Sequence, residues 1–141
     1  MHLADPLPPG HSSCLRLQHL EVSETRMQTV ATIETLNRLI QVCRGAEDFC
    51  ETAARGTGGA DLATVLRQRG EEWGRLGDEL QALVLLLGGE PAMSASLAAR
   101  ARHFALGARL AALGPADATV IAAWQRIERR AEARYLEAIE G

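Results

Sequence analysis

The stretch from residue 29 to residue 87 constrains the fold most, because its apolar side chains recur every three or four residues. This spacing places them on one side of an α-helix. Gly56-Thr57-Gly58-Gly59 divides the stretch and is typical of a turn between helices. Each half would be roughly 40 Å long at about 1.5 Å per residue. Two such helices cannot cover both apolar faces with each other alone, so the pattern predicts a bundle with further helices.

Each of the two apolar faces contains one charged residue. The first face comprises Ile33, Leu36, Ile40, Cys43, Glu47, Cys50 and Ala54, and the second comprises Leu62, Leu66, Arg69, Trp73, Leu76, Leu80, Leu83 and Leu87. Burying an unpaired charge is costly, so Glu47 and Arg69 should have partners, either each other or further charged residues. Glu128 lies beside the apolar face of the last predicted helix. We therefore predict a buried charge network of Glu47, Arg69 and Glu128.

The rest of the chain also reads as helix. A stop at Gly88-Gly89 precedes a shorter helix, which begins at Ser94 or Ser96 and ends at Leu113. The predicted packing face of this helix is Leu97, Ala101, Phe104, Ala108 and Ala111. A last helix is expected from Asp117, a capping residue, to about Ile139. Asp61 is the expected cap of the second long helix. No segment alternates with the period of a strand. The fold class is therefore all-α, an up-and-down helical bundle of three long helices and one shorter helix.

The first 28 residues differ from the rest. Pro6, Pro8, Pro9 and Gly10 disfavour regular structure, and we expect residues 1–28 to be a disordered tail before a bundle domain at residues 29–141. Whether translation starts at Met1 or Met27 stays open. The tail does not have the pattern of a signal peptide, and Cys14, Cys43 and Cys50 lack a CxxC spacing. We expect reduced thiols and a cytoplasmic protein.

Composition limits the partners. The longest apolar run, Ala82 to Leu87, is far shorter than a membrane span, which argues against a membrane partner. The net charge is −3 and no basic block stands free of acids, so we expect no nucleic-acid partner. Nucleophilic catalysis would need a base beside Cys43 or Cys50, and no histidine lies near them in the sequence. These features favour a non-catalytic module.

Three segments resemble one family. Residues 35–47, Thr-Leu-Asn-Arg-Leu-Ile-Gln-Val-Cys-Arg-Gly-Ala-Glu, resemble the opening of the bacterial DUF2383 proteins. Residues 79–91 are similar to the end of that family's second helix, and Gln125 to Glu128 with Tyr135 are similar to a segment of its last helix. The resemblance covers roughly residues 30 to 140 and implies a ferritin-like bundle.

The resemblance also implies two alternative functions. Ferritin-like di-metal sites use carboxylates from two helices and a Glu-x-x-His pair from each of two others. Glu47 and Glu128 match the family's helix carboxylates, whereas Glu72 is followed by Arg75 instead of histidine, and His103 stands beside Arg102. One alternative is thus a metal-binding protein with storage or oxidase activity, holding iron or manganese through Glu47, Glu72, Glu128 and His103. The other is a non-catalytic binding or structural module with no cofactor.

The resemblance bears on assembly as well. Family members continue with one more long helix than this sequence supplies. Either the shorter helix fills the fourth side of the bundle, or an apolar groove is left open, and a partner would cover such a groove. We therefore expect a homo-oligomer.

Overall fold

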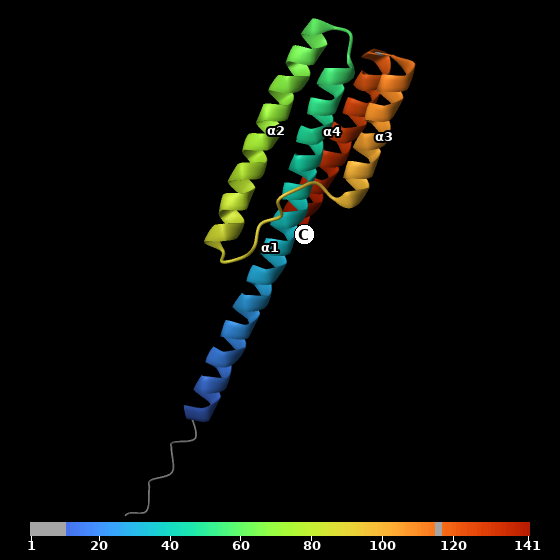
Figure 1. The fold of residues 1–141 in the computed structure, drawn as a ribbon. Coiled ribbons are helices and arrows are strands. Elements are labelled where there is room, and N and C mark those ends of the chain that lie inside the picture. The colour runs from blue at the N-terminus through green and yellow to red at the C-terminus, as the bar shows by residue number, and fades with distance from the viewer. Residues whose placement is uncertain (1–10, 115–116) are drawn as a thin grey trace, which may run out of the picture. The chain divides into compact units, whose positions relative to one another are not determined.

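The computed structural model describes residues 11–114 and 117–141, which form four helices and no strand (Figure 1). They are α1 (His11–Gly56), α2 (Ala60–Leu86), α3 (Leu97–Leu113) and α4 (Asp117–Glu140). The predicted all-α bundle is confirmed, with α3 as the shorter helix at 17 residues. Successive helices alternate in direction, so α2 and α4 run the same way. Among the described residues, no helix combines the length and apolar composition that a membrane span requires.

The chain divides into two compact units, one ending at Thr32 and the other comprising Ile33–Gly141. The helix α1 contributes to both and begins at His11, well before the expected start near Thr29. Residues 11–28 are therefore helical, although we expected them to belong to a disordered tail. The physical reason is that no proline or glycine interrupts the sequence between His11 and Gly45. Residues 1–10 of the expected tail lie outside the described residues.

Local chemistry explains the other helix ends. Of the two expected starts of α3, Ser94 and Ser96, the structure selects Ser96, whose hydroxyl oxygen caps the helix by accepting a hydrogen bond from the Ala99 N–H at 3.2 Å. The prediction for Asp61 is wrong. Gly59 occupies the cap position of α2, and Asp61 lies in the first turn, where its charge still complements the helix dipole. At the far end of α2, Gly88 adopts a φ of +79° that favours glycine.

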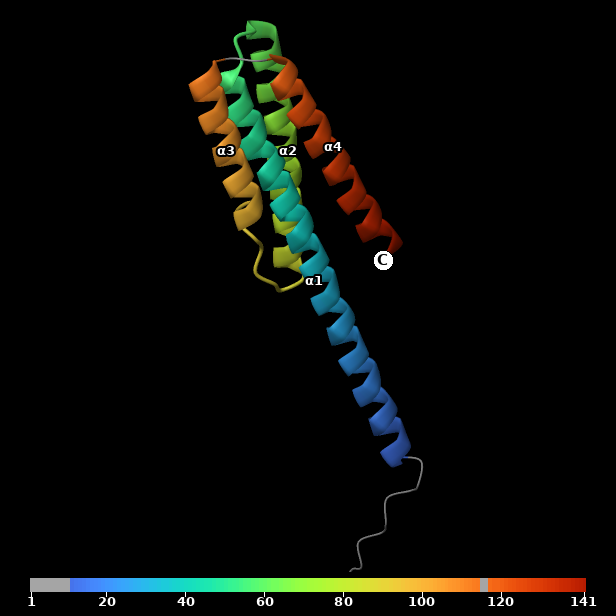
Figure 2. The same cartoon turned by 90° about the vertical axis from the view of Figure 1, so that its right-hand side faces the viewer.

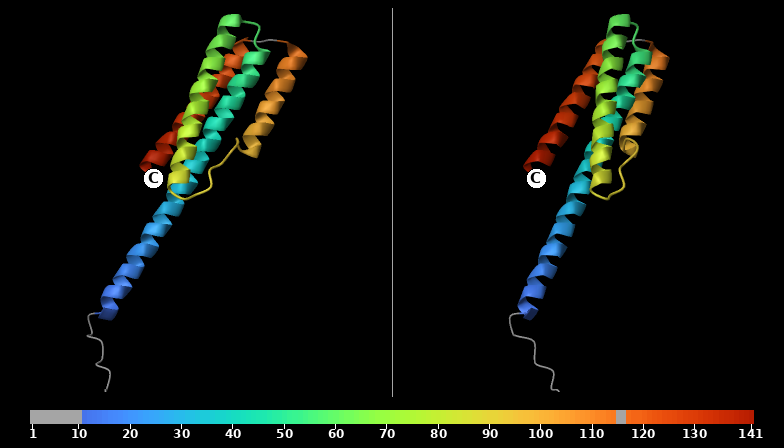
Figure 3. Two further views of the ribbon diagram at one scale, coloured as in Figure 1. Left: turned by 60° about the vertical axis from the view of Figure 1, so that its left-hand side comes forward. Right: turned by 90° about the vertical axis from the view of Figure 1, so that its left-hand side faces the viewer.

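Packing against α2 and α3 places α1 between them (Figures 1 and 3). On the α2 side, Gly70 is so close to α1 that an added Cβ would lie 3.1 Å from the Cys50 Cβ. On the α3 side, a Cβ added to Gly56 would lie 2.7 Å from the Leu110 Cδ1. The largest fully buried side chains are Phe49, Ile40, Leu66, Val84, Val120, Cys43 and Cys50. Glycines thus allow the helix axes to approach closely, and the buried side chains lie on and around α1.

The connection from α2 to α3 is held by side-chain amides. Asn37 of α1 donates to the Glu90 carbonyl at 3.0 Å and accepts from the Ala92 N–H at 2.7 Å. Gln81 of α2 donates to the Ala92 carbonyl at 2.8 Å. Because these bonds reach the connection from two helices, they fix it to the end of the bundle.

The predicted packing face of α3 is wrong. Leu97 and Phe104, which we expected in the core, are 80% and 82% exposed. Leu110 is the buried residue of α3, and its contact with Gly56 turns the opposite side of the helix toward α1. Both sides of α3 are apolar, so the period of the sequence could not decide which side packs.

Candidate functional site: the Glu128 cluster and the groove between α2 and α4

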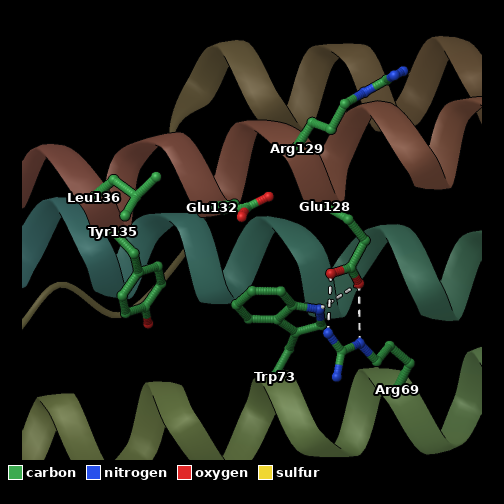
Figure 4. A pocket seen from close by; sticks show the side chains of 7 residues that line it. All are labelled: Arg69, Trp73, Glu128, Arg129, Glu132, Tyr135 and Leu136. Atoms are coloured by element: carbon green, nitrogen blue, oxygen red, sulfur yellow. Dashed lines mark hydrogen bonds and ion pairs between the residues drawn. The ribbon is translucent and has the colours of Figure 1, made fainter.

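The Glu128 carboxylate of α4 accepts four hydrogen bonds, of which those from Arg69 and Trp73 are drawn in Figure 4. Arg69 of α2 donates through Nε to Oε1 and through Nη2 to Oε2, both at 3.0 Å. The indole Nε1 of Trp124 donates to Oε1 at 2.9 Å, and that of Trp73 donates to the same oxygen at 3.3 Å. This paired arrangement is the strong form of an arginine–carboxylate contact, and it joins α2 to α4. We call these residues, with Glu72, the Glu128 cluster.

Arg69 has two further contacts in the cluster. Its Nη1 donates to Glu72 Oε2 at 2.7 Å, and its guanidinium carbon lies 5.4 Å from the Trp73 ring centroid, a cation–π distance. The Arg69 hydrogen bonds lower the pKa of Glu128, against the opposing effect of burial. The same contacts with Glu128 and Glu72 raise the pKa of Arg69. Glu128 is therefore a fixed anion at neutral pH and not a general acid.

The structure brings Arg69 and Glu128 together as predicted but leaves Glu47 out of their cluster. Glu47 pairs with Arg44 at 2.9 Å, one turn earlier on α1. Its side chain passes Gly74 of α2, where an added Cβ would lie 2.7 Å from Glu47 Oε1. The word "buried" is also wrong for this network, because no charged residue among the described ones is buried. The physical reason is that all three residues lie at the edges of helix contacts, where water reaches them.

Sequence reasoning missed the role of Arg44. Its Nη2 donates to Asp78 Oδ1 at 2.6 Å and to Gln81 Oε1 at 2.9 Å, and its Nη1 reaches the Gly74 carbonyl at 3.3 Å. The hydrogen bond to Asp78 raises the pKa of Arg44. One feature of the sequence indicates part of this role: Arg44 and Glu47 are three residues apart, a spacing that pairs side chains on a helix. The partners on α2 could not be read from it.

The four candidate metal ligands do not assemble. Glu72 and Glu128 both bind Arg69, and Glu47 binds Arg44. His103 of α3 packs against Phe49 with ring centroids 5.9 Å apart, and its Nδ1 is buried without a hydrogen-bond partner. Nowhere in the described chain do three metal-ligating side chains converge. A di-iron or di-manganese site needs several converging carboxylates, so this arrangement does not fit one.

A groove of about 360 Å³ opens beside the Glu128 cluster. It is lined by Arg69, Trp73, Glu128, Arg129, Glu132, Tyr135 and Leu136 (Figure 4). Helix α4 diverges from α2 toward its C-terminal end, and this divergence opens the space (Figures 2 and 3). The volume is at the small end of the range of about 300–1,000 Å³ for ligand pockets. It has room for side chains of a docked element.

The two buried thiols, Cys43 and Cys50, are not activated nucleophiles. The Tyr135 hydroxyl and the Cys43 Sγ are 3.2 Å apart. Burial raises the pKa of both groups, and it raises the pKa of Cys50 to about 12. The thiolate is the reactive form of cysteine, and here it is disfavoured.

Fold and site together define an all-α bundle in which the charged groups of the helix contacts bind one another. Comparison with known families then places the chain. A domain of unknown function, DUF2383, matches residues 31–141, and the chain belongs to this family. The match covers the bundle and agrees with the resemblance in residues 35–47, 79–91 and 125–135. Neither the curated proteins nor the solved structures gave a match.

Proposed function

We propose that this protein is a non-catalytic helical-bundle module that binds a helix in the groove between α2 and α4 and thereby self-associates. The observation that carries the proposal is the composition of the groove rims. Exposed or half-exposed residues follow one side of each helix at the spacing of a helix face: Glu72, Leu76, Glu79 and Leu83 on α2, and Glu132, Leu136 and Ile139 on α4. Apolar side chains in such rows are the usual binding surface for an amphipathic helix.

Most polar groups at the helix contacts are hydrogen-bonded to one another, which supports binding over catalysis. Arg69 and the two tryptophans direct their N–H groups at Glu128, and Arg44 directs its own at Glu47, Asp78 and Gln81. Groups that satisfy one another in this way hold helices in register. A catalytic pair would instead need two groups with a free proton or lone pair beside each other, whereas Glu132 is the one carboxylate of the groove lining that binds no partner in the described chain.

Sedimentation velocity of the full chain tests the proposal. We expect the wild type to associate reversibly at tens of micromolar, and Leu136→Asp in the groove to shift the equilibrium to monomer. Leu85→Asp is the matched control, because Leu85 is also exposed, at 62%, but lies on a different side of α2. A wild-type protein that remains monomeric at these concentrations would refute the proposal, as would equal effects of the two substitutions.

A further inference from the structure

The outward side of α3 is an apolar surface that nothing in the described chain covers. It consists of Leu97, Ala101, Phe104, Ala108 and Ala111, spaced alternately four and three residues apart and all exposed. Ala98, Ala105 and Ala112 extend it. This row has the spacing of a helix–helix contact, with two large side chains among alanines. We call it the α3 face.

Positive charge borders the α3 face. Arg100 lies on one side of the row, and Arg102 and Arg109 lie on the other. All three are exposed, and α3 contains no acidic residue. An occupant of this face should therefore offer apolar side chains together with carboxylates.

The lining of the groove between α2 and α4 pairs two arginines with two glutamates, and its α2 rim adds the carboxylates of Glu72 and Glu79. Glu79 and Glu132 are exposed and Glu72 is half-exposed. Arg69 binds Glu72 and Glu128, so Glu79 and Glu132 are the carboxylates left for a docking partner. Arg129 is the remaining positive side chain of the lining, and it extends away from the cluster (Figure 4). The groove thus combines carboxylates with Leu136, Ile139 and Leu83.

We infer that α3 of one copy docks in the groove between α2 and α4 of a second copy, an inference that rests on the proposed self-association. Phe104 would enter the groove against the ring of Tyr135 and the side chain of Leu136. The alanines beside Phe104 allow the helix axes to approach closely. Arg100, Arg102 and Arg109 would then lie near Glu79 and Glu132, where opposite charges orient the docking helix.

Two other occupants suit the α3 face less well. A second α3 would bring like charges together, because neither copy supplies a carboxylate from that helix. An anionic membrane surface would match the arginines, but most of the face is alanine, which contributes little apolar area to insertion.

The positions of the two surfaces determine the kind of assembly. The α3 face and the groove lie on opposite sides of α1 (Figures 1 and 3). A contact between two different surfaces of the same chain is heterologous, so it generates a ring or an open chain of copies. The expected species is a series of oligomers that grows with concentration.

Two charge-reversal variants of the full chain test the inference by sedimentation velocity. Variant one is Arg100→Glu, Arg102→Glu, Arg109→Glu, and variant two is Glu79→Lys, Glu132→Lys. None of these side chains has a hydrogen bond or ion pair within the described chain. We expect each variant alone to weaken association by at least about tenfold, because like charges then face each other. We expect a mixture of the two to associate again.

Single apolar substitutions complete the experiment. Phe104→Asp should abolish association, whereas Leu113→Asp, on the same helix and 75% exposed, should leave it unchanged. Circular dichroism of each variant establishes that the bundle is folded. Association that survives charge reversal on either surface, or two variants that fail to associate when mixed, would overturn the docking of α3 while leaving self-association standing. A monomeric wild type would overturn both. Binding of the wild type to phosphatidylglycerol vesicles through Phe104, without self-association, would also overturn it.

Discussion

Removing the Glu128 carboxylate should destabilise the bundle more than removing any exposed ion pair. Glu128→Ala deletes four hydrogen bonds from Arg69, Trp73 and Trp124. A hydrogen bond to a charged group contributes about 1.5–3 kcal/mol when it is well shielded. The Glu128 side chain is 30% exposed, so water replaces part of this, and Arg69 keeps its bond to Glu72. We therefore expect a loss of about 2–3 kcal/mol in the free energy of unfolding.

The isosteric substitution separates charge from hydrogen bonding. Glu128→Gln keeps an oxygen that accepts from the indoles but cannot take both donors of Arg69, so we expect a loss of about 1 kcal/mol. A double-mutant cycle with Arg69→Met should give a coupling energy of about 1 kcal/mol. The carboxylate has a lowered pKa in the folded state, so its contribution is present above its ordinary pKa and is lost as the pH falls through the folded value. Glu128→Gln should therefore flatten the acid side of the stability profile.

Urea denaturation provides the assay, followed by circular dichroism and by tryptophan fluorescence. The sequence has two tryptophans and both donate to Glu128, so fluorescence reports on this one carboxylate. The control is Glu137→Ala on the same helix, because Glu137 pairs with Arg134 at 3.0 Å while both side chains are about two-thirds exposed. That change should stay within about 0.5 kcal/mol. Equal losses for Glu128→Ala and Glu137→Ala, with an unchanged emission spectrum, would refute the account of the cluster.

Two further predictions concern buried groups. Burial lowers the pKa of His103 despite the nearby Asp48, so the unfolded chain binds more protons and stability should fall as the pH drops through the ordinary histidine range. Urea midpoints should show this fall, and it should vanish in His103→Gln; a fall of equal size in that variant would contradict the assignment. Exposed Cys14 should react with a thiol reagent in the folded protein, whereas buried Cys43 and Cys50 should react only after unfolding. Three thiols reacting at one rate before urea is added would show that the core is open.

The helices could be predicted from the sequence because their limits depend on local chemistry. Each helix stop lies where it was expected, at Gly56-Thr57-Gly58-Gly59, at Gly88-Gly89 and at Gly114. The early start of α1 was missed because Pro9 and Gly10 were taken to break more of the chain than they do. From His11 onward no proline or glycine occurs before Gly45, so the local sequence permits a helix there.

The candidate site could be predicted only in part, because it depends on which side of each helix meets another. Arg69 lies on a predicted apolar face and Glu128 lies beside one, and the structure pairs them. Glu47 also lies on a predicted apolar face, but it pairs with Arg44. This pairing depends on the space beside Gly74, which a side chain at that position would fill. An open groove was one expected alternative, but its position and lining could not be predicted, since they result from the divergence of two helices.

The glycines of α2 have a mechanical consequence. Gly70, Gly74 and Gly77 present backbone and hydrogen atoms to α1 where other helices present interlocking side chains. Such a smooth surface resists translation along the helix axis weakly. Polar links, chiefly Arg44 to Asp78 and Gln81 and Arg69 to Glu128, therefore contribute to the longitudinal position of α2. Leu66, Leu80 and Val84 of α2 also hold it in place through the core. Without the polar links α2 would have fewer contacts that resist translation, and the groove that it shares with α4 would change width.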